Sequence, residues 1–151
     1  MELIEKIEER YKSSIREKDS NSINTLRLIK SSIKDKLISL RGKKDSLSEN
    51  DILSLLQNLI KQRKDSIEAF EKANRNDLIE KERAEIEIIE AFLPKQKNEQ
   101  ETQKIIDDLI KENNLTSIKD MGKLMNIIKS NYIGQIDMGV AGKIAKSSLG
   151  K

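Results

Sequence analysis

The sequence predicts an all-α fold, and three features of the composition support that prediction. Only six glycines and one proline occur in 151 residues, and both residue types disfavour helix interiors. Aromatic residues make up 3 %, so the bulky side chains that favour strands are scarce. Hydrophobic residues recur at three- and four-residue spacings, which places them on one face of a helix. We therefore expect helices that pack through apolar faces.

Four helices are predicted for residues 1–95, which would form an N-terminal helical bundle or hairpin domain. The first covers about 2–18 and carries a stripe made of Leu3, Ile4, Ile7, Tyr11 and Ile15. The second follows a polar break at 19–21, and its apolar face holds Ile23, Leu26, Ile29, Ile33, Leu37 and Leu40. Gly42 follows that face directly and suits the left-handed backbone at a helix C-terminus.

The third and fourth helices are expected to form an antiparallel hairpin. The third begins at Ser48, whose hydroxyl can accept a hydrogen bond from the Asp51 amide. Its inward residues are Ile52, Leu55, Leu56, Leu59, Ile60, Ile67 and Phe70. After a turn containing Asn74, which tolerates positive φ, the fourth helix presents Leu78, Ile79, Ile86, Ile89 and Leu93. Pro94 ends this helix, because a proline ring clashes with the preceding turn.

A polar linker after Pro94 marks the predicted boundary to a small three-helix C-terminal domain, residues 96–151. Asn98, with Glu101 three residues later, is typical of a capped helix start. Helices are expected at about 99–113, from 117 onward and from about 137 onward. Their apolar residues are Ile105, Ile106, Leu109 and Ile110, then Met121, Leu124, Met125 and Ile128, then Val140, Ala141, Ile144, Ala145 and Leu149. The apolar stretch 132–136 is also expected to pack.

Arg63 interrupts the apolar stripe of the third predicted helix. In a hairpin that turns at 74–76, this residue lies beside Glu85 or Ile86 of the fourth helix, and it faces the carboxylate of Glu82 or Glu85. We expect a partly buried structural ion pair between Arg63 and Glu85, which specifies helix register more than it adds stability. The alternative is that the basic run 61–64 contacts phosphate.

The residue types exclude most catalytic chemistry. The chain contains no histidine and no cysteine, so Cys-His and Ser-His-Asp systems and most zinc sites are excluded. No glycine-rich loop precedes a Lys-Ser/Thr pair, so a phosphate-binding loop of that kind is also excluded. Carboxylates on the fourth helix alternate with Lys81 and Arg83, as on a solvated surface. We expect no catalytic residue, no metal and no cofactor.

Basic residues concentrate at the two ends of the chain. Residues 1–45 carry a net charge of +4, residues 46–97 carry −2, and the chain from Asn114 onward carries +4. Lysines together with helix N-terminal amides can hold phosphate oxygens, although a plain solvated surface has the same composition. The candidate RNA-contact residues are Lys119, Lys123, Lys129, Gly134, Lys143 and Lys146.

The location of the protein is predicted by elimination. No apolar run approaches the roughly 18 residues that span a bilayer. The N-terminal residues lack the basic-then-apolar layout of a secretory signal, and without cysteine no oxidising compartment is required. We therefore expect a cytoplasmic protein that does not engage a membrane.

Several segments, taken in order, resemble the YqeY-like family. They are residues 26–30 with 33–34, 59–67, 85–96, 119–125 and 134–137, with Ile-Lys-Gln-Arg and Phe-Leu-Pro-Lys-Gln as the most specific strings. Where the family usually has an apolar residue, an arginine and a glycine, this chain has Lys97, Gln135 and Met138.

The YqeY-like family is similar to the tail region of the B subunit of tRNA-dependent Asp/Glu amidotransferase, a helical appendage that contacts the outer corner of tRNA. The resemblance implies a helical hairpin domain, a small three-helix domain, and tRNA or another structured RNA as the partner. It implies kinship with a glutamine-dependent carbon–nitrogen ligase but supplies no catalytic residue.

Three functions stay open at the level of sequence. The first is a tRNA-binding helical module that could assist an amidotransferase or a synthetase as its protein partner. The second is a protein–protein adaptor that docks through the C-terminal domain or its 132–136 stretch. The third is an enzyme with glutamine-dependent amide chemistry of its own.

Overall fold

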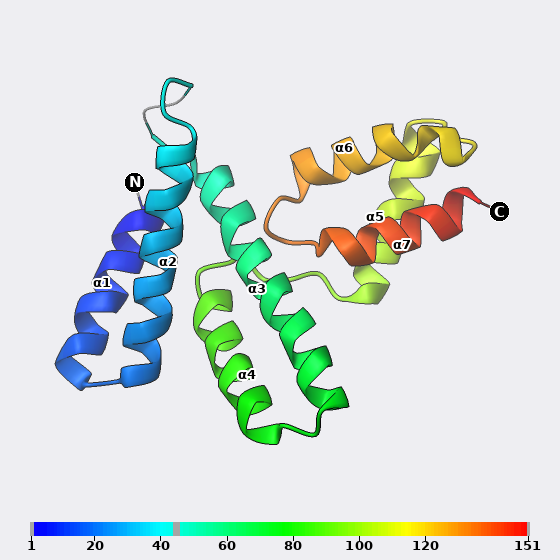
Figure 1. The fold of residues 1–151 in the computed structure, drawn as a ribbon. Coiled ribbons are helices and arrows are strands. Elements are labelled where there is room, and N and C mark those ends of the chain that lie inside the picture. Colours follow the sequence, from blue (N-terminus) through cyan, green and yellow to red (C-terminus); the bar gives the residue numbers. More distant parts are fainter. Residues whose placement is uncertain (1, 44–45, 151) are drawn as a thin grey trace. The chain divides into compact units, whose positions relative to one another are not determined.

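The computed structural model describes residues 2–43 and 46–150, and these residues form helices and no strand (Figure 1). The helices are α1 (Glu2–Glu17), α2 (Ser20–Ser39), α3 (Glu49–Lys72), α4 (Asn76–Glu90), α5 (Glu99–Glu112), the short 3-10 helix η1 (Ile118–Asp120), α6 (Met121–Asn131) and α7 (Met138–Leu149). The all-α prediction is confirmed. The chain divides into two compact units, Met1–Pro94 and Lys95–Lys151. Positions 1 and 151, the outer bounds of the expected domains, lie outside the described residues.

Local capping explains where several helices begin. The Ser48 hydroxyl accepts from the Asp51 amide at 3.1 Å, and the Asp51 carboxylate accepts from the Ser48 amide at 3.0 Å. Asn98 and Glu101 repeat this reciprocal arrangement at the start of α5, with distances of 2.7 and 3.1 Å. Each arrangement satisfies amides that have no partner inside their own helix. The helix starts predicted at Ser48 and Asn98 are therefore confirmed.

The first unit consists of two helical hairpins, α1–α2 and α3–α4, with α2 packed against α4 (Figure 1). Lys18 and Asn74 lie in the two hairpin turns and have positive φ values of 57° each. The buried apolar residues of this unit are Leu3, Ile7, Leu26, Ile29, Ile52, Leu53, Leu56, Leu59, Ile60, Ile79, Ile86 and Ile89. Leu53 is buried where the sequence predicted Leu55, which is half-buried.

The apolar stripe predicted for α1 is wrong in part. Ile4 and Ile15 are 43 % and 48 % exposed, whereas Ser14 is fully buried. The Ser14 hydroxyl donates to the Arg10 carbonyl at 2.8 Å and accepts from the Arg10 guanidinium at 3.1 Å. The same guanidinium donates to the hydroxyl of Ser22 on α2 at 3.4 Å. Near the α1–α2 turn, the buried side of α1 is therefore formed by the hydrogen-bonded Ser14, whereas the apolar pattern had predicted that Ile15 would be buried there.

Helix α4 ends earlier than the proline predicts. Its last residue is Glu90, and the chain then turns through hydrogen bonds from the Phe92 amide to the Ile89 carbonyl and from the Leu93 amide to the Glu90 carbonyl. Pro94 follows this turn. The helix has therefore already ended when the chain reaches the residue that cannot continue it.

Candidate nucleic-acid interface

In the second unit, α5, α6 and α7 pack around one apolar core, and each helix turns one face toward it. Its buried residues are Ile106, Leu109, Leu115, Leu124, Ile128, Ile136, Ala141, Ile144, Ala145 and Leu149. They come from α5, α6, α7 and the connecting loops, and α7 packs against both other helices. Because the inward positions are apolar, the charged residues of α6 and α7 lie on the outer surface. Val140, which the sequence placed inward, is 38 % exposed.

Two helices of this unit, α6 and α7, carry lysines and no acid. Helix α6 carries Lys123 and Lys129, helix α7 carries Lys143 and Lys146, and all four residues are exposed. Lys119 is exposed in η1, just before α6. In contrast, α5 carries five acids and two lysines, a net charge of −3. The second unit therefore has one acidic helix, α5, and two basic helices, α6 and α7.

Asp120, just before α6, and Asp137, just before α7, each accept hydrogen bonds from backbone amides. Asp120 accepts from the Thr116 amide at 2.9 Å and from the Ser117 amide at 3.4 Å, and these bonds lower the pKa of its carboxyl. The Asp137 carboxylate accepts from the Gly139 and Val140 amides at 2.8 and 3.2 Å. The first amides of α7 are therefore filled from within the chain, so this helix start does not offer them to an external phosphate.

The loop before α7 brings together two segments that lie about 40 residues apart. The Gln96 side-chain amide donates to the Gly134 carbonyl, and the Lys97 amide donates to the Gln135 carbonyl at 2.8 Å. Gly134 is buried and has a φ of 79°, a conformation that glycine adopts at little cost. Gly134 is therefore a loop-forming residue of the interior, and we remove it from the predicted RNA-contact set.

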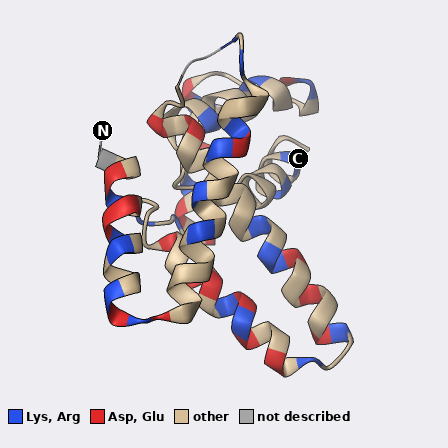
Figure 2. Ribbon diagram, turned by 60° about the vertical axis from the view of Figure 1, so that its left-hand side comes forward, with Lys and Arg blue, Asp and Glu red and all other residues tan. Residues whose placement is uncertain are grey.

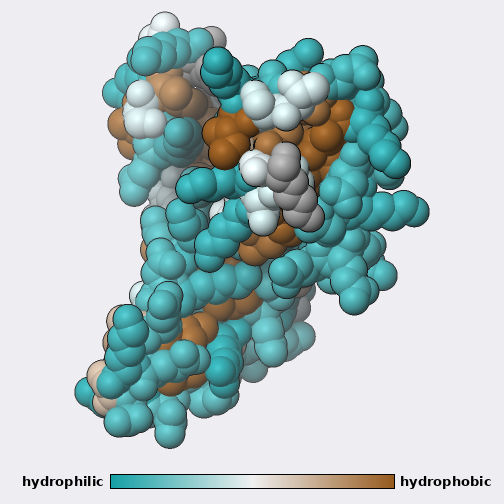
Figure 3. All heavy atoms as spheres, turned by 90° about the vertical axis from the view of Figure 1, so that its right-hand side faces the viewer, coloured by the Kyte–Doolittle hydropathy of each residue, from teal (hydrophilic) through white to brown (hydrophobic). Residues whose placement is uncertain are grey.

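The apolar stretch 132–136 belongs to this core. Ile136 is only 1 % exposed, and Tyr132 packs against the buried cluster. The stretch was the predicted docking face of a protein–protein adaptor; Gly134 and Ile136 are buried, whereas Tyr132, Ile133 and Gln135 are half-buried. The large apolar residues that remain exposed in this unit are Ile118, at 51 %, and Val140. Figure 3 shows hydrophilic side chains over most of the visible surface, with hydrophobic atoms in narrow areas between them.

The structure brings Arg63 and Glu85 into contact in the first unit. The Arg63 Nε donates to the Glu85 carboxylate at 2.8 Å, and a second guanidinium nitrogen donates to the Leu59 carbonyl at 3.0 Å. The Glu82 carboxylate lies 4.0 Å away. The side chains of Arg63 and Glu85 are 9 % and 18 % exposed, so solvent screens this pair little. Since its guanidinium is occupied internally, Arg63 is not available to contact phosphate.

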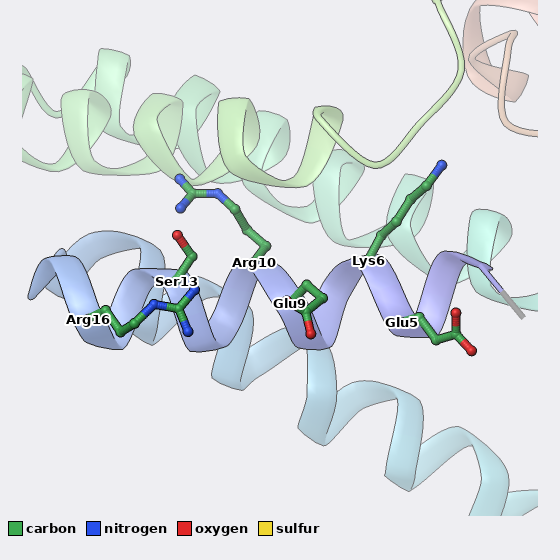
Figure 4. A pocket seen from close by; sticks show the side chains of 6 residues that line it. All are labelled: Glu5, Lys6, Glu9, Arg10, Ser13 and Arg16. Carbon is green, nitrogen blue, oxygen red and sulfur yellow. The ribbon is translucent and has the colours of Figure 1, made fainter.

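A shallow hollow of about 570 Å³ lies beside α1. Its lining residues are Glu5, Lys6, Glu9, Arg10, Ser13 and Arg16, all from that one helix. Lys6, Arg10 and Ser13 point to one side of α1, while Glu5, Glu9 and Arg16 point to the other (Figure 4). Charges of both signs are mixed here, so the hollow has no preference for an anionic or a cationic ligand.

Two further features are absent from the described part of the chain. No three metal-ligating side chains gather among residues 2–43 and 46–150. None of the helices in these ranges has the length and hydropathy that crossing a bilayer demands.

Comparison with known proteins identifies a family and several relatives. The family model described as Yqey-like protein matches residues 4–149. A protein of Lachancea thermotolerans named "Altered inheritance of mitochondria protein 41, mitochondrial" is 49 % identical over 76 residues, which is 50 % of this chain and 40 % of that protein. A protein of the same name from Pyrenophora tritici-repentis is 29 % identical over 129 residues, 81 % of this chain and 68 % of that protein. The Saccharomyces cerevisiae S288c protein of this name is 40 % identical over 76 residues, with coverages of 50 % and 40 %.

These relatives overturn the expected cytoplasmic location. Their names are those of mitochondrial proteins, and the matches span 40 % of the length of the Lachancea and Saccharomyces proteins. The expectation was wrong because it was reached by elimination. A chain without cysteine and without an apolar span is compatible with several compartments, so these absences could not single out the cytoplasm.

Proposed function

This chain belongs to the Yqey-like protein family, and we propose that it is a non-catalytic helical module that binds tRNA or another structured RNA. The observation that carries this proposal is the pair of helices α6 and α7, which present four exposed lysines and no acid. With Lys119, these residues form what we call the α6–α7 basic surface. RNA is the ligand of choice because its phosphates are closely spaced single charges.

Phosphate recognition by such a surface has a physical signature. Each lysine that neutralises a phosphate releases condensed counterions, so the observed affinity falls with a fixed power of the salt concentration. Lysines contact phosphate as point charges and read no base sequence. We therefore expect affinity for structured RNA with little dependence on base sequence and a steep dependence on salt.

The test is a filter-binding titration of the full chain with total tRNA at salt concentrations from 50 to 200 mM. The variant Lys143→Gln with Lys146→Gln removes two charges from α7 and should lower the logarithmic salt slope by roughly 1.4 to 1.8, the value for two lost phosphate contacts. Absence of RNA binding by the unmodified chain at 50 mM salt would exclude the proposal.

A matched control separates a local contact from the effect of total charge. Lys104 and Lys111 are exposed lysines of α5, the acidic helix of the same unit. Lys104→Gln with Lys111→Gln removes the same charge and should leave the salt slope within about 0.5 of the unmodified value. Equal slopes for the two double variants would show that only net charge matters, and the assignment to α6 and α7 would then be wrong.

A further inference from the structure

Helix α2 and the turn that follows it form the basic segment of a unit whose other helices are acidic. Between Ser20 and Lys43 the chain has six cations, Arg27, Lys30, Lys34, Lys36, Arg41 and Lys43, and a single acid, Asp35. Helices α1, α3 and α4 of the same unit carry net charges of −1, −1 and −4. Figure 2 shows Lys and Arg recurring along α2.

Internal contacts explain only part of this charge. Lys30 forms an ion pair with Glu8 at 3.0 Å and lies 4.2 Å above the centre of the Tyr11 ring. Arg27 donates to the Tyr11 hydroxyl at 3.4 Å, which is a long and weak hydrogen bond. Across the described residues, no ion pair involves Arg27, Lys34 or Arg41.

The remaining structural explanation is the helix dipole, which favours cations in the last turn. It accounts for Lys36, the cation in the last turn of α2. It does not account for Arg27 and Lys34, which lie in the middle of α2. The buried apolar residues of α2 are Leu26 and Ile29, so packing explains these apolar positions and leaves Arg27 and Lys34 unexplained.

The spacing of Arg27 and Lys34 places these two residues on a common side of α2. Arg27 and Lys34 are seven residues apart, close to two helical turns, so they project in nearly the same direction about 10 Å apart along the axis. Arg41 follows after another seven residues, in the turn that succeeds α2. All three residues are exposed. We call Arg27, Lys34 and Arg41 the α2 basic face.

The chemistry of this face fits a row of phosphates better than a lipid surface. A helix that lies in a membrane interface needs a continuous apolar face beside its cations. In α2 the apolar face is inside the protein, and the exposed apolar residues Leu28 and Ile38 are ten residues apart. A chain of phosphates needs only spaced cations, and arginine offers it a planar pair of donors.

From this pattern we propose that the α2 basic face is a second contact surface for the phosphate backbone of RNA, separate from the α6–α7 basic surface. The proposal rests on the proposed function, because it takes structured RNA as the ligand. It adds that the first unit takes part in binding and that Arg27, Lys34 and Arg41 each neutralise a phosphate.

The experiment is a filter-binding titration of the full chain with total tRNA between 50 and 200 mM salt. The triple variant Arg27→Gln, Lys34→Gln, Arg41→Gln is compared with Lys61→Gln, Lys72→Gln, Lys81→Gln, which removes three exposed lysines from α3 and α4. Each lost phosphate contact makes the fall in affinity over this salt range about 3-fold smaller. The α2 variant should therefore lose about 30-fold of the salt-dependent fall, and the α3–α4 variant less than about 3-fold.

The outcomes distinguish this inference from the proposed function. If the unmodified chain binds RNA, and the α7 double variant weakens binding while the α2 triple variant does not, only the second surface is wrong. If the unmodified chain binds no RNA, both proposals are overturned. Cosedimentation with vesicles of phosphatidylcholine and phosphatidylserine provides the last arm: vesicle binding that is lost in the α2 variant, with RNA binding unchanged, would contradict RNA as the occupant. Circular dichroism melting checks that every variant keeps its helices.

Discussion

The Arg63–Glu85 pair allows a stability experiment whose outcome follows from its geometry. Glu85→Gln keeps the shape of the side chain but removes the negative charge that faces Arg63 at 2.8 Å. Hydrogen bonds to charged groups contribute about 1.5–3 kcal/mol. Loss of one partner from a fully buried pair costs about 3–5 kcal/mol. Because Glu85 is 18 % exposed and Glu82 lies 4.0 Å from Arg63, we expect Glu85→Gln to lower the free energy of unfolding by about 2 kcal/mol.

Two double variants test whether an apolar pair, or an ion pair with its charges exchanged, can replace the Arg63–Glu85 pair. Arg63→Met with Glu85→Met should return to within about 1 kcal/mol of the unmodified protein, because apolar pairs often substitute for buried ion pairs without loss. The charge swap Arg63→Glu with Glu85→Arg should stay about 2 kcal/mol less stable. In the swap, a carboxylate at position 63 meets the Leu59 carbonyl, which now accepts from Arg63 at 3.0 Å, so two acceptors face each other.

The measurement is urea-induced unfolding followed by circular dichroism, with thermal melting as a second observable. A loss of 2 kcal/mol corresponds to a decrease in Tm of about 8–16 °C for a domain of this size. The reasoning is refuted if Glu85→Gln costs less than about 0.5 kcal/mol, the range of exposed ion pairs. It is also refuted if the charge swap is as stable as the unmodified protein, because Leu59 would then not restrict the orientation of the pair.

Three further predictions concern the second unit. Gly134→Ala should lower the free energy of unfolding by about 1–2 kcal/mol in urea titrations, because its φ of 79° disfavours a β-carbon; unchanged stability would show that the loop can rearrange. Asn98→Ala should cost about 1 kcal/mol in the same assay through loss of the α5 cap, and Asn98→Asp should recover most of it. Asp120→Asn should lower the Tm at pH 7, since hydrogen bonds lower the folded-state pKa of Asp120 and its charged form therefore stabilises the fold. The stabilisation by charged Asp120 is present above its unfolded-state pKa and is lost as the pH falls through its lowered folded-state pKa. The Tm difference between Asp120→Asn and the unmodified protein should therefore vanish in acid. A difference that persists in acid would contradict a lowered pKa for Asp120.

Most of the local structure could be predicted from short stretches of the sequence. Residues that cap helices specify where they begin, and this information lies within three residues, as at Ser48 and Asn98. The position of Arg63 opposite Glu85 followed from the length of the hairpin turn and the helical rise. The lack of histidine and cysteine excludes whole classes of chemistry at the level of composition.

Which of several equivalent helix faces is buried depends on tertiary packing and could not be predicted from local sequence. On α1, apolar spacing fits Leu3, Ile7, Ile4 and Ile15 to one broad stripe, but the structure buries the first two and exposes the last two. The choice depends on the packing partner, since Ser14 joins the buried side through its hydrogen bonds with Arg10.

Gly134 shows the same limit for the candidate site. The sequence analysis placed it among the candidate RNA-contact residues, and the structure places it in the interior of the second unit. Lysines on α6 and α7 could be identified from the sequence because exposed charges follow from an apolar opposite face. The Gly134 contact with Gln96 could not, because it joins residues 38 positions apart and depends on how the whole unit packs.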